Sequence, residues 1–114
     1  MAVISHPDTV AEITQRLIGF FNPERIYLFG SEARGDAGPD SDLDFIVVVA
    51  DEAPAALLSG AGHAAMLKGI AAAVDVIPWR KSDFEGRAAH VATSLPATVV
   101  REGRLLYDAG RMAA

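Results

Sequence analysis

Residues 28–45 read LFGSEARGDAGPDSDLDF, and this stretch determines the fold of the chain. A β-rich run over residues 25–29 ends abruptly at Gly30, which predicts a first strand. The polar residues 31–41 contain two glycines and a proline, so we expect a short helical turn followed by a loop. Residues 43–49 are apolar except for one aspartate and predict a second, mostly buried strand.

Two aspartates, Asp42 and Asp44, stand at the start of the second predicted strand. Side chains two positions apart in a strand point to the same side, so both carboxylates should face one direction. Two such acids repel each other unless a positive charge lies between them, and Mg²⁺ prefers carboxylate and phosphate oxygens. The spacing therefore predicts a clamp for a cation. A lone Asp-x-Asp pair could also be an ordinary solvated pair beside a turn.

Gly30 and Ser31 follow the first strand directly and predict a phosphate-binding turn. Glycine lets backbone amides approach a bound anion without a Cβ in the way. A helical turn over residues 31–34 would aim its free N–H groups at the same anion. Arg34 would add a bidentate partner for phosphate oxygens, or it could pair with an acid of the same loop.

A third acid, Asp75, interrupts an apolar run over residues 73–78, which predicts a third short strand ended by Pro78. We expect this carboxylate to be buried, and a buried carboxylate needs a partner. Beside the other two aspartates it would complete one metal site and accept the proton of an attacking hydroxyl. The alternative is an acid at a strand end that pairs with Arg80.

The other apolar patterns predict helices over residues 8–21, 55–73 (interrupted by glycines), 82–93 and 95–102, and a final edge strand over residues 105–107. Ser82 and Glu85 have the spacing of a capping box, and the tail from Asp108 onward should be loose. The expected fold class is α/β (α+β), with a small mixed sheet of about four strands and helices packed against it. One domain should span residues 1–114.

Composition excludes several functional classes. The net charge is −5 and the ten basic residues are scattered, so binding of a nucleic-acid polymer is not expected. The absence of cysteine excludes disulfides, zinc–thiolate sites and a thiol nucleophile. No apolar run approaches the roughly 20 residues of a membrane span, and the N-terminus lacks a secretory signal, so we expect a cytoplasmic protein without membrane association.

In these residues the sequence resembles the minimal, MNT-type nucleotidyltransferases of the DNA polymerase beta superfamily. The family pattern is Gly-Ser, a spacer, Asp-x-Asp at a strand and a third Asp on a later strand. It is matched by Gly30, Ser31, Asp42, Asp44 and Asp75. The surrounding Gly-Ser-x-Ala-Arg-Gly and Ser-Asp-Leu-Asp-Phe segments, and a closing Glu-Gly-x-x-Leu-Tyr, are similar to the family as well. The resemblance implies the nucleotidyltransferase fold.

For the mechanism, the resemblance implies two Mg²⁺ ions, with Asp42 and Asp44 bridging both and Asp75 completing the ion that activates the acceptor. Ser31 and the amides near Gly30 would hold the β and γ phosphates. The reaction would be an in-line attack on the α phosphate of a nucleoside triphosphate, with pyrophosphate as the leaving group.

Members of this minimal family are often similar to antitoxins that pair with small helical HEPN-type proteins and modify a hydroxyl on that partner. The resemblance therefore implies AMP transfer from ATP to a partner protein, within a homo- or hetero-oligomer. Two alternatives stay open. The chain could be a catalytically silent antitoxin that acts by contact alone, or a small-molecule transferase of the aminoglycoside type, although such relatives usually carry an extra helical domain for the acceptor.

Overall fold

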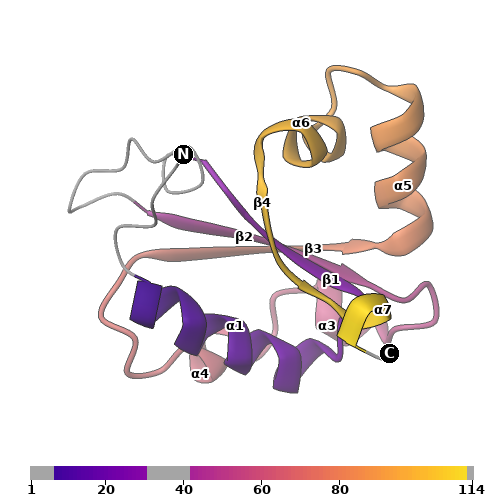
Figure 1. The fold of residues 1–114 in the computed structure, drawn as a ribbon. Coiled ribbons are helices and arrows are strands. Elements are labelled where there is room, and N and C mark those ends of the chain that lie inside the picture. The colour runs from indigo at the N-terminus through magenta and orange to yellow at the C-terminus, as the bar shows by residue number, and fades with distance from the viewer. Residues whose placement is uncertain (1–6, 31–41, 113–114) are drawn as a thin grey trace.

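Four strands form one mixed sheet at the centre of the computed structural model, which describes residues 7–30 and 42–112 (Figure 1). The strands are β1 (Arg25–Phe29), β2 (Leu43–Val49), β3 (Val74–Arg80) and β4 (Arg104–Asp108). Their order across the sheet is β3-β2-β1-β4. β1 is antiparallel to both of its neighbours, whereas β2 and β3 are parallel. The predicted fold class is confirmed.

Helices cover both faces of this sheet (Figure 1). They are α1 (Pro7–Phe21), α3 (Ala55–Leu58), α4 (His63–Met66), α5 (Lys81–His90), α6 (Leu95–Glu102) and α7 (Ala109–Met112). α1, α3 and α4 pack on one face, and α5 and α6 pack on the other. In the part of the chain that the structure describes, no helix has the length and apolarity needed to cross a membrane.

β2 is buried on both sides because its side chains enter two separate cores. Its odd-numbered residues from Phe45 to Val49 pack with α1, whereas Ile46 and Val48 pack beneath α5 and α6. Side chains two apart in a strand share a face. Asp44 precedes Ile46 by two residues, so its carboxylate lies on the face that α5 and α6 partly cover, which we call the α5/α6 face.

The predicted strands and helices match the structure closely at the site and less well elsewhere. β1, β2 and α6 have the predicted bounds, and β4 is an edge strand as expected. The helix predicted over residues 55–73 is interrupted by glycines as expected, but its extent is wrong, because only α3 and α4 form there and residues 67–73 are not helical. Gly60 and Gly62 lie between them with φ of 86° and 80°, and this left-handed conformation ends a helix.

The end of the described chain is more ordered than expected. Asp108 belongs to β4, and the four residues of α7 follow it. The Ala109 N–H donates to the Glu24 carbonyl at 2.9 Å, and the Gly110 N–H donates to the Asp108 carboxylate at 2.9 Å. The prediction of a loose tail from Asp108 is therefore wrong for residues 108–112, because these hydrogen bonds tie them to the sheet.

β3 continues through the proline that was expected to end it. The Leu43 N–H donates to the Ala73 carbonyl at 2.8 Å, and the register pairs Leu43 with Val74. With this hydrogen-bond pattern, the N–H and C=O groups of the odd-numbered residues of β3 point toward β2. Those of the even-numbered residues point toward the outer edge of the sheet. The nitrogen of Pro78 therefore faces the open edge of the sheet, where its missing N–H breaks no ladder bond.

The first turn of α5 is capped from a distant loop. The helix begins at Lys81, and its N-cap residue Arg80 makes no side-chain capping bond, so the predicted Ser82 capping box is wrong. Instead, the Asp51 carboxylate accepts the Ser82 N–H at 2.9 Å, and Arg80 donates to the carbonyls of Asp51 and Ala53. This hydrogen bond from the Ser82 backbone is the main reason that the pKa of Asp51 is lowered.

We expect Asp51→Ala to lower the Tm of the protein, because the first turn of α5 loses its acceptor. A carboxylate with a lowered pKa stabilises the folded state above its ordinary value of 3.8, and that stabilisation is lost as the pH falls through the folded-state pKa. The Tm difference from the unmodified protein should therefore be full at pH 7 and shrink as the pH falls below 3.8. Thermal melts between pH 7 and pH 3 measure it, and Glu52→Ala is the matched control. An equal difference at both pH values would contradict the capping role.

Candidate active site

The strand register brings Gly30, Asp44 and Asp75 together from three strands. Asp44 is opposite Phe29 of β1 on one side and opposite Asp75 of β3 on the other. Gly30 follows Phe29 directly, so it lies at the same end of the sheet. Asp44 and Asp75 share the α5/α6 face, because Asp75 precedes Trp79, which packs in the core on that face, by four residues.

Gly30 lies against the carboxylate of Asp44. A Cβ built on Gly30 would stand 2.8 Å from Asp44 Oδ2, closer than real Cβ contacts allow. Its φ of 85° is also in the left-handed region, which side chains with a Cβ rarely adopt. The positive φ therefore favours glycine where the chain leaves β1, and a Cβ there would also displace the Asp44 carboxylate.

Asp44 carries a negative charge that its neighbours make unfavourable. Its pKa is raised, first by partial burial and then by the charge of Asp75, which also lies within hydrogen-bonding reach, with a smaller contribution from Asp42. Oxygen donors gathered with excess negative charge are the ligands that Mg²⁺ prefers. The pair Asp44 and Asp75 therefore fits a divalent cation.

The other predicted site residues are described only in part. Asp42 is exposed, lies just before β2, and acts on Asp44 through its charge. Ser31 and Arg34 lie outside the described residues. Within residues 7–30 and 42–112, no group of three or more His, Cys, Asp or Glu side chains has the arrangement of a metal site. The side chains of Asp44 and Asp75 are thus the two predicted ligands that the structure places in close contact.

Asp75 is exposed, so the expectation that it is buried is wrong. The reason is the sheet order, which places β3 at an edge. The alternative pairing with Arg80 is also wrong, because Arg80 donates to backbone carbonyls at the opposite end of β3. Sequence reasoning overlooked Ile77, which shares the face of Asp75 and leaves 36% of its surface exposed. Ile77 could have been predicted to share that face, because it lies two residues after Asp75 in the same strand.

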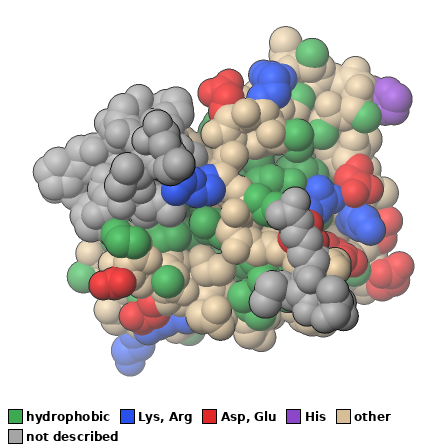
Figure 2. Space-filling model, in the orientation of Figure 1, with side chains coloured by type: hydrophobic (Ala, Val, Ile, Leu, Met, Phe, Trp, Pro, Cys, Tyr) green, Lys and Arg blue, Asp and Glu red, His purple; other side chains and the backbone are tan. Residues whose placement is uncertain are grey.

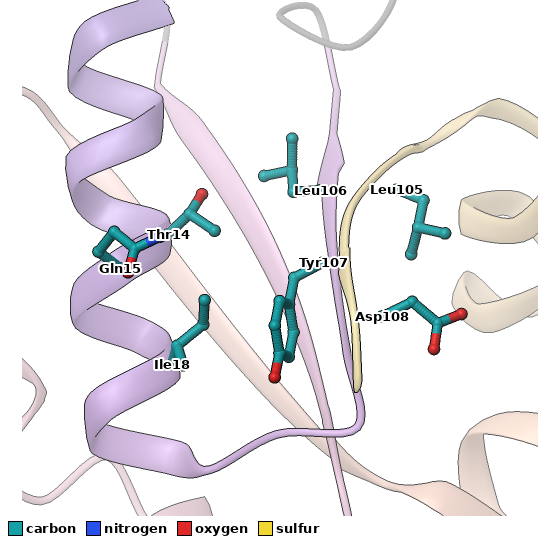
Figure 3. A pocket seen from close by; sticks show the side chains of 7 residues that line it. All are labelled: Thr14, Gln15, Ile18, Leu105, Leu106, Tyr107 and Asp108. Carbon is teal, nitrogen blue, oxygen red and sulfur yellow. The ribbon is translucent and has the colours of Figure 1, made fainter. Parts of the chain in front are cut away.

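The surface charge and a groove between α1 and β4 are two further features that could bind a ligand. Basic and acidic side chains are interspersed on the surface in Figure 2, with no continuous basic patch on the described part of this face. A groove of about 280 Å³ lies between α1 and β4. Figure 3 shows Thr14 and Ile18 of α1 on one side of it and Leu106 and Tyr107 of β4 on the other. It belongs to the α1 face, so it is separated by the sheet from Asp44 and Asp75.

Comparison with known proteins identifies the family. The nucleotidyltransferase domain family matches residues 8–105, and the chain therefore belongs to this family. A candidate nucleotidyltransferase from Sulfolobus solfataricus has a similar fold, with a TM-score of 0.59 and 22% identity over 91% of this chain and 81% of that one. A toxin–antitoxin crystal structure with AMP-PNP aligns with a TM-score of 0.49 and 23% identity over 89% of this chain and 72% of that one. Among curated proteins, none is significantly similar to this chain.

We expect Asp44→Asn to raise the Tm at pH 7 in the absence of divalent ions. A carboxylate whose pKa is raised in the folded state favours folding below its ordinary value of 3.8, and this contribution is lost as the pH rises through the folded-state pKa. The amide carries no charge, so the gain in Tm over the unmodified protein should be absent below pH 3.8 and complete above the folded-state pKa of Asp44. Thermal melts from pH 3 to pH 8 in EDTA measure it, with the exposed acid variant Asp83→Asn as control. A lower Tm than the unmodified protein at pH 7 would contradict this account of Asp44.

Gly30→Ala should remove the stabilisation that Mg²⁺ and a nucleoside triphosphate together give the protein, because the new Cβ displaces Asp44. Misplacement of a site group by about 1 Å typically costs about a hundredfold in activity. Gly69→Ala is the matched control, since Gly69 has a similar φ of 87° and its Cβ would meet nothing within 4 Å. Gly19→Ala, in a helix and equally without contacts, controls for the added methyl group alone. An alanine there should stabilise α1 by about 0.5–1 kcal/mol. If Gly30→Ala kept the full ligand-induced Tm shift, the contact with Asp44 would have no role in the site.

Proposed function

We propose that this protein is a metal-dependent nucleotidyltransferase that moves AMP from ATP to a hydroxyl on a partner protein. The observation that carries the proposal is the register that sets Asp44 between Gly30 and Asp75. Membership of the nucleotidyltransferase domain family supports the reaction class. The antitoxin role, with a small helical HEPN-type partner, rests on the resemblance of residues 28–45 and 102–107 to the MNT-type proteins.

In this proposal Asp42, Asp44 and Asp75 hold two Mg²⁺ ions, and Gly30, Ser31 and Arg34 bind the phosphates. When bound, the ions supply positive charge that offsets the developing charge of the reacting phosphate. The raised pKa of Asp44 supports this assignment, because partial burial and the charges of Asp75 and Asp42 make its negative charge unfavourable, and a bound cation would offset that cost. The left-handed backbone at Gly30 lets the chain turn away from β1 beside the Asp44 carboxylate, so a phosphate bound at this turn would lie next to the proposed metal ligands.

The transfer is a displacement at phosphorus. The acceptor oxygen forms a bond to the α phosphorus while the bond from that phosphorus to its bridging oxygen breaks. Pyrophosphate leaves with the electron pair, and the acceptor proton passes to the Asp75 carboxylate. Asp75 suits this role because it is exposed on an outer strand, so an acceptor can reach it from solvent.

The double variant Asp42→Asn/Asp44→Asn should reduce AMP transfer at least about a hundredfold, since the loss of supporting groups alone costs 10–100-fold at metal sites. The measurement is the mass gain of one AMP on a protein that co-purifies with the chain, after incubation with ATP and Mg²⁺. Binding of that partner should be unchanged in the double variant. Asp83→Asn controls for the loss of surface charge.

Three outcomes would redirect the assignment. Transfer that survives in the double variant would place the chemistry elsewhere. Intact partner binding without transfer by the unmodified protein, for any nucleoside triphosphate, would favour the silent binding module. Transfer to an aminoglycoside with no modification of the partner would favour the small-molecule transferase.

A further inference from the structure

The sheet order places the residues of the candidate site in a row across the sheet. Gly30 follows β1, Asp44 lies on β2, and Asp75 lies on β3, so the three occur in sequence across the sheet. If the phosphates bind beside Gly30, the opposite side of Asp75 is left for the acceptor. That side is the outer edge of β3, and no strand among the described residues pairs with it.

The outer edge of β3 presents hydrogen-bonding groups next to Asp75. The phase of the β2–β3 ladder turns the peptide groups of Val74 and Val76 outward. Pro78, the next outward residue, has no N–H to donate. Only the stretch from Val74 to Val76 therefore offers both a donor and an acceptor at each outward position, and Asp75 is its centre.

We propose that the acceptor is an extended segment of a partner protein that adds to β3 as an antiparallel strand and places a hydroxyl side chain beside Asp75. This inference rests on the function proposed above. In such a pair Asp75 would occupy a non-hydrogen-bonded position, where opposite Cα atoms approach to about 4.5 Å instead of about 5.5 Å. Strand addition to an open sheet edge is a common way to bind peptides, and it positions alternate side chains on a chosen face.

Ile77 adds a preference in the sequence of the acceptor. It lies on the same face as Asp75 and is 36% exposed, which is unusual for a large apolar side chain in the sheet. In the antiparallel register, the residue two positions before the hydroxyl residue lies opposite Ile77. The segment should therefore carry an apolar residue at that position, because this contact removes exposed apolar surface from water.

The reaction with this segment is the displacement at phosphorus described above. The hydroxyl oxygen of the segment bonds to the α phosphorus, the bond to the bridging oxygen breaks, pyrophosphate leaves with the electron pair, and the proton goes to Asp75. Asp75 takes the proton of the reacting hydroxyl, whereas Val74, Val76 and Ile77 bind the segment and position it.

The test uses nine-residue peptides with one central tyrosine, serine or threonine and valine two residues before it, incubated with the protein, ATP and Mg²⁺. Mass spectrometry measures AMP on the peptide, and AMP released to water is measured in parallel. We expect N-methylation of the residue just before the hydroxyl residue to lower kcat/KM at least about tenfold through KM, since it removes a donor to the Val76 carbonyl. N-methylation two residues before the hydroxyl residue is the matched control, because that N–H points away from β3.

Val76→Pro should have the same effect from the protein side, since it removes an outward N–H that β2 does not use. Val76→Ala controls for the smaller side chain, because it keeps the outward N–H, and it should retain most of the kcat/KM toward the peptide that Val76→Pro loses. Ile77→Ser should abolish the preference for an apolar residue two positions before the hydroxyl residue.

The possible failures are distinguishable. No AMP transfer to any acceptor, water included, would refute the proposed function and this inference with it. AMP release to water without peptide modification would overturn strand addition alone. Equal modification of the two N-methylated peptides, or a stable homodimer that Val76→Pro dissociates, would also overturn it.

Discussion

The parallel pairing of β2 with β3 is the constraint on which the candidate site depends, because it holds Asp44 beside Asp75. Carboxylates avoid each other in water, so two of them stay close only when the backbone holds them. Here the parallel β2–β3 ladder does so, and β2 is held in turn by the two cores on its faces. The stability of those cores therefore maintains a charge arrangement that is unfavourable by itself. Such stored electrostatic cost is typical of sites that bind cations.

The two edges of the sheet differ in a way that matches this site. β4 shifts register between Ile26 and Tyr27, and the α7 turn follows it directly. A register shift at an edge discourages pairing with another chain. Within the residues that the structure describes, β3 pairs with no strand on its outer side, and Pro78, which lacks an N–H, lies three residues beyond Asp75. The edge beside the acids is thus more accessible to an added strand than the edge far from them.

Local sequence patterns predicted the strands that carry the site. They did not predict features that depend on contacts between residues far apart in the sequence. The apolar runs of β1 and β2 and the Asp-x-Asp spacing are local, so the sequence predicted them with the observed bounds. Asp75 is exposed because β3 is an outer strand, and the order of strands in a sheet cannot be predicted from a local sequence pattern. The cap of α5 comes from Asp51, 31 residues before Ser82, which no short motif reveals. Likewise, the close approach of Gly30 to Asp44 follows from antiparallel pairing across a loop.

A parallel strand pair requires a long crossover, and here α3 and α4 form part of it between β2 and β3. Neither short helix contains a buried residue, although Leu57, Leu58 and Met66 are partly buried against the core on the α1 face. The turn between the two helices, residues 59–62, is exposed. The entropy of closing a loop grows only slowly with its length. Insertions in this exposed turn of the crossover should therefore leave the two carboxylates in register. The crossover is the part of the chain where evolution can change length and surface while the chemistry stays in place.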